Sequence, residues 1–234
     1  MTQRTSAPTK HRHPLGGKPL SMQLTPHRIA KLKSAYASFS STNDMLRLID
    51  FWTDCHHEEA QTMMQACFKS AESAATSVLD WVNLAGRYEA AAMHFHESLF
   101  GRSLDCMHQA ESMCETSEDW LLCACSWTCS QMGDKTNDRE AVQALRMAVL
   151  KAKTSQDFAD IAYECGTLFF HNQGTTAMLR QAEALIETEE DQDYFDSVRD
   201  DLECDSEITE DRIPDLPFEI VEGRVEYKPL TSQM

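Results

Sequence analysis

The chain has 234 residues, 42% of them hydrophobic, and a formal net charge of −17, a size that suits one domain or a short array of repeats. No run of residues approaches the roughly 18 apolar positions of a membrane-spanning helix, and no secretory apolar segment follows the N-terminus. We therefore expect a cytoplasmic protein without a membrane span.

The charge is unevenly distributed along the chain. All 38 acidic residues follow residue 43, whereas seven of the 21 basic residues precede it. An anionic body repels nucleic acid and anionic lipid, so we expect neither as a main partner. Residues 1–26 are basic and contain several prolines, which is typical of a disordered leader. The alternatives are that this arm binds an acidic partner or folds back on its own body.

Residues 27–200 are predicted to form an all-α repeat domain. No proline occurs between His27 and Ile213, and the absence of proline permits long uninterrupted helices. The pattern predicts about four helix–break–helix repeats of 36–39 residues, packed either as a bundle or as a short solenoid.

Each repeat contains a helix-start signature in which Ser or Thr is followed three residues later by Asp. In such a capping box the hydroxyl accepts from a backbone amide, and the carboxylate lies at the positive end of the helix dipole. The four predicted caps are Ser41, Ser77, Thr116 and Thr154. A fifth, weaker copy begins at Thr188, with Asp191 in the acidic position.

Small and apolar residues recur at fixed offsets from the caps. Six positions before each cap stands an alanine, and four positions after it stands an apolar residue. The alanines are Ala35, Ala71, Ala110 and Ala148, and the later residues are Met45, Trp81, Trp120 and Phe158. An alanine column predicts close approach of two helices. We expect Trp81, Trp120 and Phe158 to anchor the core of each unit.

Three clusters contain residue types that can carry chemistry, and we interpret all three as structural. Residues 55–59 (Cys-His-His-Glu-Glu) lack a second ligand pair at zinc spacing. Residues 94–97 lack the paired Glu-x-x-His motifs of a di-iron bundle, although His94 and Glu97 have the spacing of an ion pair. Cys123, Cys125 and Cys129 have no neighbouring basic residue that would activate a thiol.

The remaining motif survey also argues against an enzyme. There is no Cys-x-x-Cys, so the nine cysteines are expected mostly as small core residues. Neither a Gly-rich phosphate loop nor a nucleophile elbow is present. We therefore predict no catalytic, cofactor-binding or metal-binding residues and no cofactor.

Residues 201–234 are predicted to be an acidic linker followed by an extended C-terminal tail. Within this tail, residues 218–227 alternate apolar and charged side chains. This alternation is typical of a short hairpin that turns at residues 222–223, or of an extended docking peptide.

Residues 151–161 (Lys-Ala-Lys-Thr-Ser-Gln-Asp-Phe-Ala-Asp-Ile), followed by Phe169, resemble phasins, the helical proteins that coat polyhydroxyalkanoate granules in bacteria. Residues 75–88 echo the same pattern of a hydroxyl cap, an acidic residue and an aromatic residue. The resemblance implies a non-catalytic protein that forms homo-oligomers, has a hydrophobic granule surface as its partner and is associated with granules. It implies no particular site residues.

The competing interpretation is a short α-solenoid of the tetratricopeptide or HEAT type. The 36–39-residue period falls between the lengths of those two repeats. The glycine-containing segment 131–135 suits a turn between solenoid helices. This interpretation predicts a protein-binding function, as an adaptor, a chaperone or an immunity-type inhibitor.

Overall fold

The computed structural model describes residues 25–38, 41–53, 59–130, 135–168, 172–204, 218–221 and 224–227. Within these residues it contains ten helices and one two-stranded sheet, which confirms the predicted all-α repeat domain. The elements are α1 (Pro26–Tyr36), α2 (Thr42–Thr53), α3 (Ala60–Ala74), α4 (Val78–His94), α5 (Leu99–Met113), α6 (Ser117–Cys129), α7 (Lys135–Lys151), α8 (Ser155–Thr167), α9 (Asn172–Ala184), α10 (Glu189–Cys204), β1 (Phe218–Val221) and β2 (Arg224–Tyr227).

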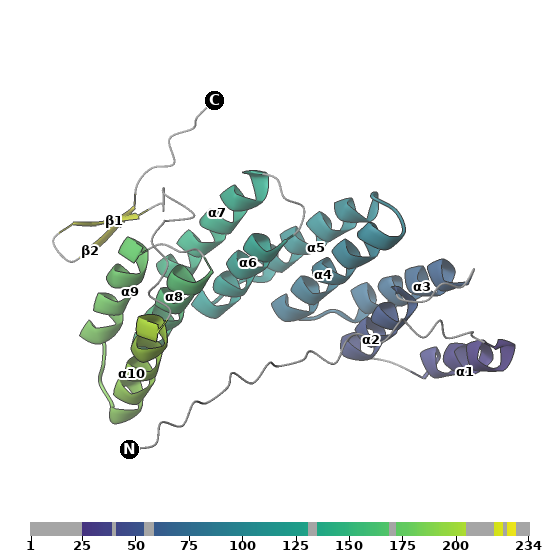
Figure 1. Ribbon diagram of the computed structural model, residues 1–234, viewed down its shortest axis with the longest axis horizontal. Coiled ribbons are helices and arrows are strands. Elements are labelled where there is room, and N and C mark those ends of the chain that lie inside the picture. Colours follow the sequence, from purple (N-terminus) through teal and green to yellow (C-terminus); the bar gives the residue numbers. More distant parts are fainter. Residues whose placement is uncertain are drawn as a thin grey trace, which may run out of the picture.

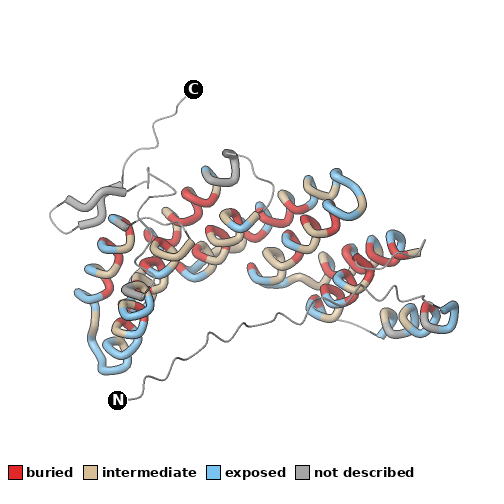
Figure 2. The backbone as a smooth tube through the Cα atoms, viewed as in Figure 1, coloured by how far each residue is buried: buried red, intermediate tan, exposed pale blue. Residues whose placement is uncertain are grey.

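The helices form a row of four hairpins, α2/α3, α4/α5, α6/α7 and α8/α9, with α10 packed beside α8 (Figure 1). We call α2, α4, α6, α8 and α10 the A helices and α3, α5, α7 and α9 the B helices. Each A helix contacts the next A helix, and each B helix contacts the following A helix. This nearest-neighbour pattern is that of a short solenoid. Buried positions lie between the packed helices, and the outer faces are exposed (Figure 2).

The predicted caps form the hydrogen bonds that their sequence indicates. The amides of Asp80, Asp119 and Asp157 donate to the hydroxyls of Ser77, Thr116 and Thr154, each at 3.1 Å. The backbone amides of the same three cap residues donate to the aspartate carboxylates at 3.0–3.1 Å. At the first cap, the Asp44 amide donates to the Ser41 hydroxyl at 3.2 Å.

The weaker fifth copy is a complete capping box. The Asp191 amide donates to the Thr188 hydroxyl at 3.1 Å, and the Thr188 amide donates to the Asp191 carboxylate at 3.0 Å. The alanine column continues as well, because Ala182 stands six positions before Thr188 and is fully buried. The array therefore contains five capped A helices.

The structure shows how the repeats are paired, which the period alone left open. Three of the capped breaks, at residues 75–77, 114–116 and 152–154, each lie between two hairpins. The helices on either side of a cap, such as α3 and α4, therefore belong to different hairpins. Helices α4 and α5, which pack extensively against one another, are joined by a connection in which Ser98, the residue before α5, forms no side-chain cap hydrogen bond.

The alanine column lies where two helices approach closely. Ala71, Ala110 and Ala148 are 0% exposed, whereas the side chain of Ala35 lies outside the described residues. The hydroxyl of Ser117, on α6, donates to the carbonyl oxygen of Ala148, on α7, at 3.0 Å. The equivalent bond joins Ser155 to the carbonyl of Ala182 at 2.9 Å. A larger side chain would separate these backbones and break the bond.

The aromatic residues four positions after the caps pack against the core from its edge. Trp81, Trp120 and Phe158 are only partly buried. The fully buried tryptophans are Trp52 and Trp127, which stand eleven positions after their caps. Tyr88 and Cys165 occupy the same position in the other two hairpins and are also buried, so this column, which the sequence comparison did not identify, contributes the largest core side chains.

The ends of the domain differ slightly from the predicted bounds. Helix α1 begins at Pro26 and α10 continues to Cys204, and residues 1–24 and 205–217 lie outside the described residues. Strands β1 and β2 pair as an antiparallel hairpin, with Phe218 opposite Tyr227 and Ile220 opposite Val225. Of the two alternatives for this segment, the structure shows the hairpin.

Two substitutions within α9 test the fifth alanine position. Replacing the buried Ala182 with Leu forces three extra carbon atoms into the α8–α9 contact, and we expect a loss of roughly 1–3 kcal/mol in the free energy of unfolding. Ala184→Leu, at an exposed position in the same helix, is expected to change stability by less than about 0.5 kcal/mol. Urea denaturation measures both, and equal effects would contradict the close packing at Ala182.

Candidate functional site

The two histidine-containing clusters, residues 55–59 and 94–97, are described in part, and the side chains of Glu59 and His96 contact groups within the protein. Residues 54–58 lie outside the described residues, and Glu59 forms an ion pair with Lys33 of α1. His94 is the last residue of α4, so Glu97 is no longer on the same helix. His96 accepts from the amide of Ser98 at 3.1 Å within the following turn. No group of three His, Cys, Asp or Glu side chains that could hold a metal occurs within the described segments.

The cysteines whose side chains the structure describes are free thiols, and four of them are buried, namely Cys67, Cys106, Cys123 and Cys165. The sulfur atoms of Cys114, at the end of α5, and Cys123, in the middle of α6, lie 3.6 Å apart. Burial raises the pKa of Cys114 to about 11 and raises that of Cys123 further. Burial also raises the pKa of Cys165 to about 12. These thiols stay protonated at neutral pH. Because the thiolate is the reactive form of cysteine, they are unreactive under these conditions.

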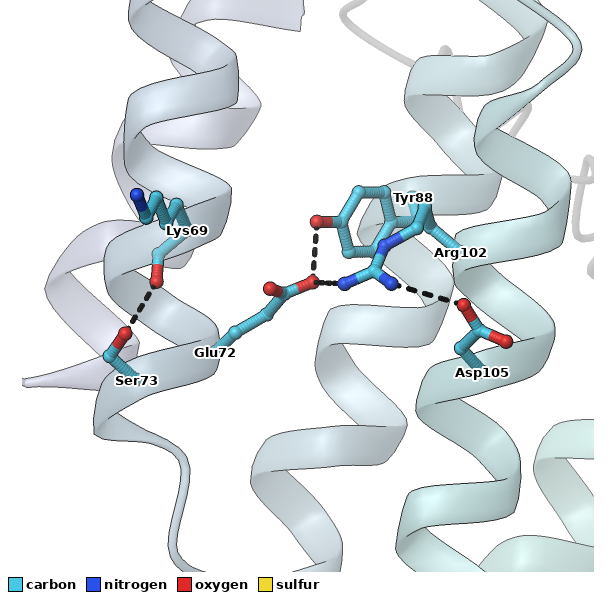
Figure 3. Close-up of polar contacts among 6 residues, drawn as sticks. All are labelled: Lys69, Glu72, Ser73, Tyr88, Arg102 and Asp105. Atoms are coloured by element: carbon cyan, nitrogen blue, oxygen red, sulfur yellow. Dashed lines mark hydrogen bonds and ion pairs between the residues drawn. The ribbon is translucent and has the colours of Figure 1, made fainter.

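The most connected polar cluster joins three helices around Glu72 (Figure 3). The Tyr88 hydroxyl donates to the Glu72 carboxylate at 2.7 Å, and the Arg102 guanidinium donates to the same oxygen at 2.5 Å. Arg102 also pairs with Asp105 at 3.1 Å. On its other side, the Tyr88 ring stacks on Phe68 with centroids 3.8 Å apart.

This cluster contains a structural element that recurs in the next hairpin. The indole nitrogen of Trp127 donates to the Glu111 carboxylate at 2.8 Å. The two donor–acceptor pairs have the same sequence separation of 16 residues, and each glutamate stands five positions before a cap. Because the same bond recurs in successive hairpins, we infer that its role is structural: it holds an A helix against the preceding B helix.

A different polar cluster lines a groove that is formed only by A helices. This α8–α10 groove has a volume of about 320 Å³. Its lining residues are Leu121 from α6, Asp160, Tyr163 and Glu164 from α8, and Tyr194, Ser197, Val198 and Asp201 from α10. Tyr163 and Tyr194 are 38% and 37% exposed, so the groove presents aromatic rings as well as carboxylates.

Two carboxylates of the groove, Asp160 and Glu164, are held in a setting that opposes their ionisation. Burial raises the pKa of Asp160, and the charges of Asp157 and Glu118 add to the effect, against a hydrogen bond from the Tyr194 hydroxyl. Burial likewise raises the pKa of Glu164, against a hydrogen bond from the Cys125 thiol, and Asp160 raises it further. Perturbed ionisable groups in a cleft are typical of functional sites.

The groove-lining residues lie on one stripe of the A helices. Asp160 and Tyr194 stand six positions after their caps, and Tyr163 and Ser197 stand nine positions after them. Spacings of three and four residues place such positions on one helix face. These positions can be counted from the caps in the sequence. Their residue types differ from repeat to repeat, however, so the sequence contains no repeated column that would identify them.

A second, smaller cavity of about 200 Å³ lies between α4, α5 and α6. Its buried carboxylate, Glu89, accepts from the Ser130 hydroxyl at 2.8 Å. The hydroxyl of Ser103, also in its wall, donates to the Ala85 carbonyl at 2.9 Å. Its polar groups thus have partners within the fold.

Large exposed hydrophobic side chains are dispersed over the described surface. They occur on α4, α7, α8, α10 and the turn after α9, and the most exposed are Leu79 (54%), Met93 (52%) and Leu150 (49%). No helix within the described ranges is both long enough and apolar enough to cross a bilayer.

No protein-family model matches the chain, and the searches of curated proteins and of solved structures likewise return no match. The choice among the clusters therefore depends on their geometry in this structure.

The raised pKa of Glu164 predicts a pH-dependent stability. When a carboxyl group has a higher pKa in the folded state than in the unfolded state, the folded protein loses stability as pH rises through the folded-state pKa. Glu164→Gln removes this cost and keeps an oxygen that accepts from Cys125. We expect the variant to have a higher Tm than the native protein at pH 7, with the difference disappearing below the ordinary glutamate pKa of 4.5.

The control is Glu183→Gln, which removes the same charge from an exposed position on α9. Thermal unfolding followed by circular dichroism between pH 3.5 and 8 measures both variants. A gain at Glu183 as large as that at Glu164 would show that the effect is only the relief of overall negative charge.

Proposed function

We propose that this protein is a non-catalytic helical-repeat protein that binds another protein along the surface formed by its A helices. The observation that carries the proposal is the unbroken contact of α2, α4, α6, α8 and α10, which places equivalent stripes side by side. Open solenoids of this kind present extended binding surfaces, and the α8–α10 groove lies on this surface.

The use of the polar groups elsewhere supports a binding role. The Glu72–Tyr88 and Glu111–Trp127 pairs hold helices together, and the buried thiols remain protonated. The carboxylates and tyrosines of the groove are instead partly exposed, on a surface that the hairpins do not need for their own packing.

The resemblance to phasins stays a prediction. A granule coat requires a continuous apolar surface, whereas the apolar stripes of these helices are buried between neighbours. Coating a hydrophobic granule would therefore require the hairpins to open. The A-helix surface requires no such rearrangement, and this difference favours the protein-binding proposal.

Photo-crosslinking in the producing cells tests the proposed surface. A photoreactive phenylalanine analogue replaces Leu79 or Tyr163 on A helices, and Leu150 or Glu183 on B helices in matched variants. All four positions are exposed, so labelling differences report the binding face. We expect a discrete protein adduct, identified by mass spectrometry, from the A-helix positions only.

Adducts of equal yield from both faces would contradict the proposal, as would adducts from the B helices alone. Co-sedimentation with polyester granules, together with new protease cleavage between the hairpins, would instead support the coating function. Circular dichroism confirms that each variant retains its helical content.

A further inference from the structure

The A helices at the C-terminal end of the array lack basic side chains to balance their carboxylates. Helices α8 and α10 contain 11 acidic residues and one basic residue, Arg199. Arg199 pairs with Asp196 and Asp200. Among the described residues, no ion pair engages Asp160 or Glu164, whose carboxylates face the groove.

At the opposite end of the array, α2 and α4 contain four acidic and two basic residues. Arg87 of α4 pairs with Asp50 of α2 at 2.5 Å, which joins two A helices through opposite charges. No comparable pair joins α8 to α10 within the described residues. The Tyr194 hydroxyl of α10 instead donates a hydrogen bond to the Asp160 carboxylate of α8, so negative charge is concentrated at this end and Arg199 alone opposes it on these two helices.

The groove also provides apolar and aromatic surface beside those carboxylates. Leu121 and Val198 are buried in its wall, and Tyr163 and Tyr194 are partly exposed. A lysine or arginine side chain has complementary parts, because its methylene stem packs on apolar surface and its charged end binds carboxylates. Tyrosine rings add a cation–π attraction when a cation lies over the face of the ring.

We propose that the α8–α10 groove binds a lysine- or arginine-bearing segment of the partner protein, with a cationic side chain seated between Asp160 and Glu164 and against the rings of Tyr163 and Tyr194. This inference rests on the proposed function and specifies the chemistry of the partner. Charge complementarity selects this occupant, because an acidic segment would be repelled and a purely apolar one would leave the half-buried carboxylates without a counter-charge.

The basic N-terminal arm of the chain has the same chemistry. Residues 1–24 contain Arg4, Lys10, Arg12 and Lys18 and no acidic residue. The arm precedes α1, however, and α1 lies at the opposite end of the array from α10 (Figure 1). An extended segment of 24 residues can span on the order of 80 Å, so the arm is the competing occupant, and a truncated chain beginning at residue 25 distinguishes the two.

The test uses a fluorescently labelled 12-residue peptide of alternating arginine and serine, and an identical peptide in which neutral citrulline replaces arginine. Fluorescence anisotropy at physiological salt measures binding to the full chain. We expect the arginine peptide to bind and the citrulline peptide to bind far more weakly. Comparable binding of the two peptides, or no binding of either, would overturn the inference.

The decisive comparison is between two variants with the same net charge. Asp160→Asn/Glu164→Gln removes the two groove carboxylates, and Glu97→Gln/Glu183→Gln removes two exposed carboxylates elsewhere. We expect the groove variant to bind the arginine peptide roughly tenfold more weakly and the control variant to change by less than about twofold. Equal losses in the two variants would mean that the peptide responds only to overall charge.

Hydrogen exchange gives a second measurement that does not depend on variants. We expect the arginine peptide to protect amides of α8 and α10 while leaving α2 and α4 unchanged, and protection confined to other helices would refute the assignment. Tight binding by the chain that lacks residues 1–24, with none by the full chain, would identify the arm as the occupant and overturn the partner assignment.

The outcomes separate this inference from the proposed function. Photo-adducts on the A helices with no preference for arginine over citrulline would refute only the cationic-segment assignment. Loss of both the adducts and the peptide binding would refute the binding surface itself.

Discussion

The reciprocal hydrogen bonding between a Ser or Thr hydroxyl and an Asp three residues later is the constraint on which the array depends. It fixes the residue at which each A helix begins, and each such cap contributes on the order of 1 kcal/mol. With that start fixed, the residue just after the cap faces the alanine of the paired B helix. The bonds from Ser117 to Ala148 and from Ser155 to Ala182 show this alignment directly. The alanine thus sets the distance between the paired helices, and the cap sets their alignment along the helix axis.

The repeat also separates structural polar groups from candidate functional ones. A polar bond that recurs at the same offset in successive hairpins, such as Tyr88 to Glu72 and Trp127 to Glu111, belongs to the architecture. Asp160 and Glu164 belong to no such pattern, because the equivalent positions in α6 are Leu122 and Ser126. Their raised pKa values mean that these carboxylates lower the stability of the folded protein at neutral pH, although the repeat packing does not depend on them. Residues that break the repeat, rather than those that form it, are the ones to associate with function.

The distribution of charge gives the two ends of the A-helix surface different properties. Near the N-terminal end, Arg87 and Asp50 neutralise one another across α2 and α4. Near the C-terminal end, the carboxylates of α8 and α10 have only Arg199 to balance them, and it is already engaged. A solenoid transmits packing only between neighbours, so a local surplus of charge at one end is tolerated without disturbing the other.

The sequence by itself determined the helical class, the caps and the alanine columns. These depend on local hydrogen bonds and on side-chain size, which short stretches of residues specify. It did not determine which helices pair, because a period of 36–39 residues is the same for α3 with α4 as for α4 with α5. It also missed the buried column of Trp52, Tyr88, Trp127 and Cys165, in which three aromatic residues and a cysteine occupy the same position, so that burial rather than one residue type defines the column. The groove was decided by tertiary structure alone: Leu121, Asp160 and Tyr194 come from three different A helices, and only packing of those helices brings them together.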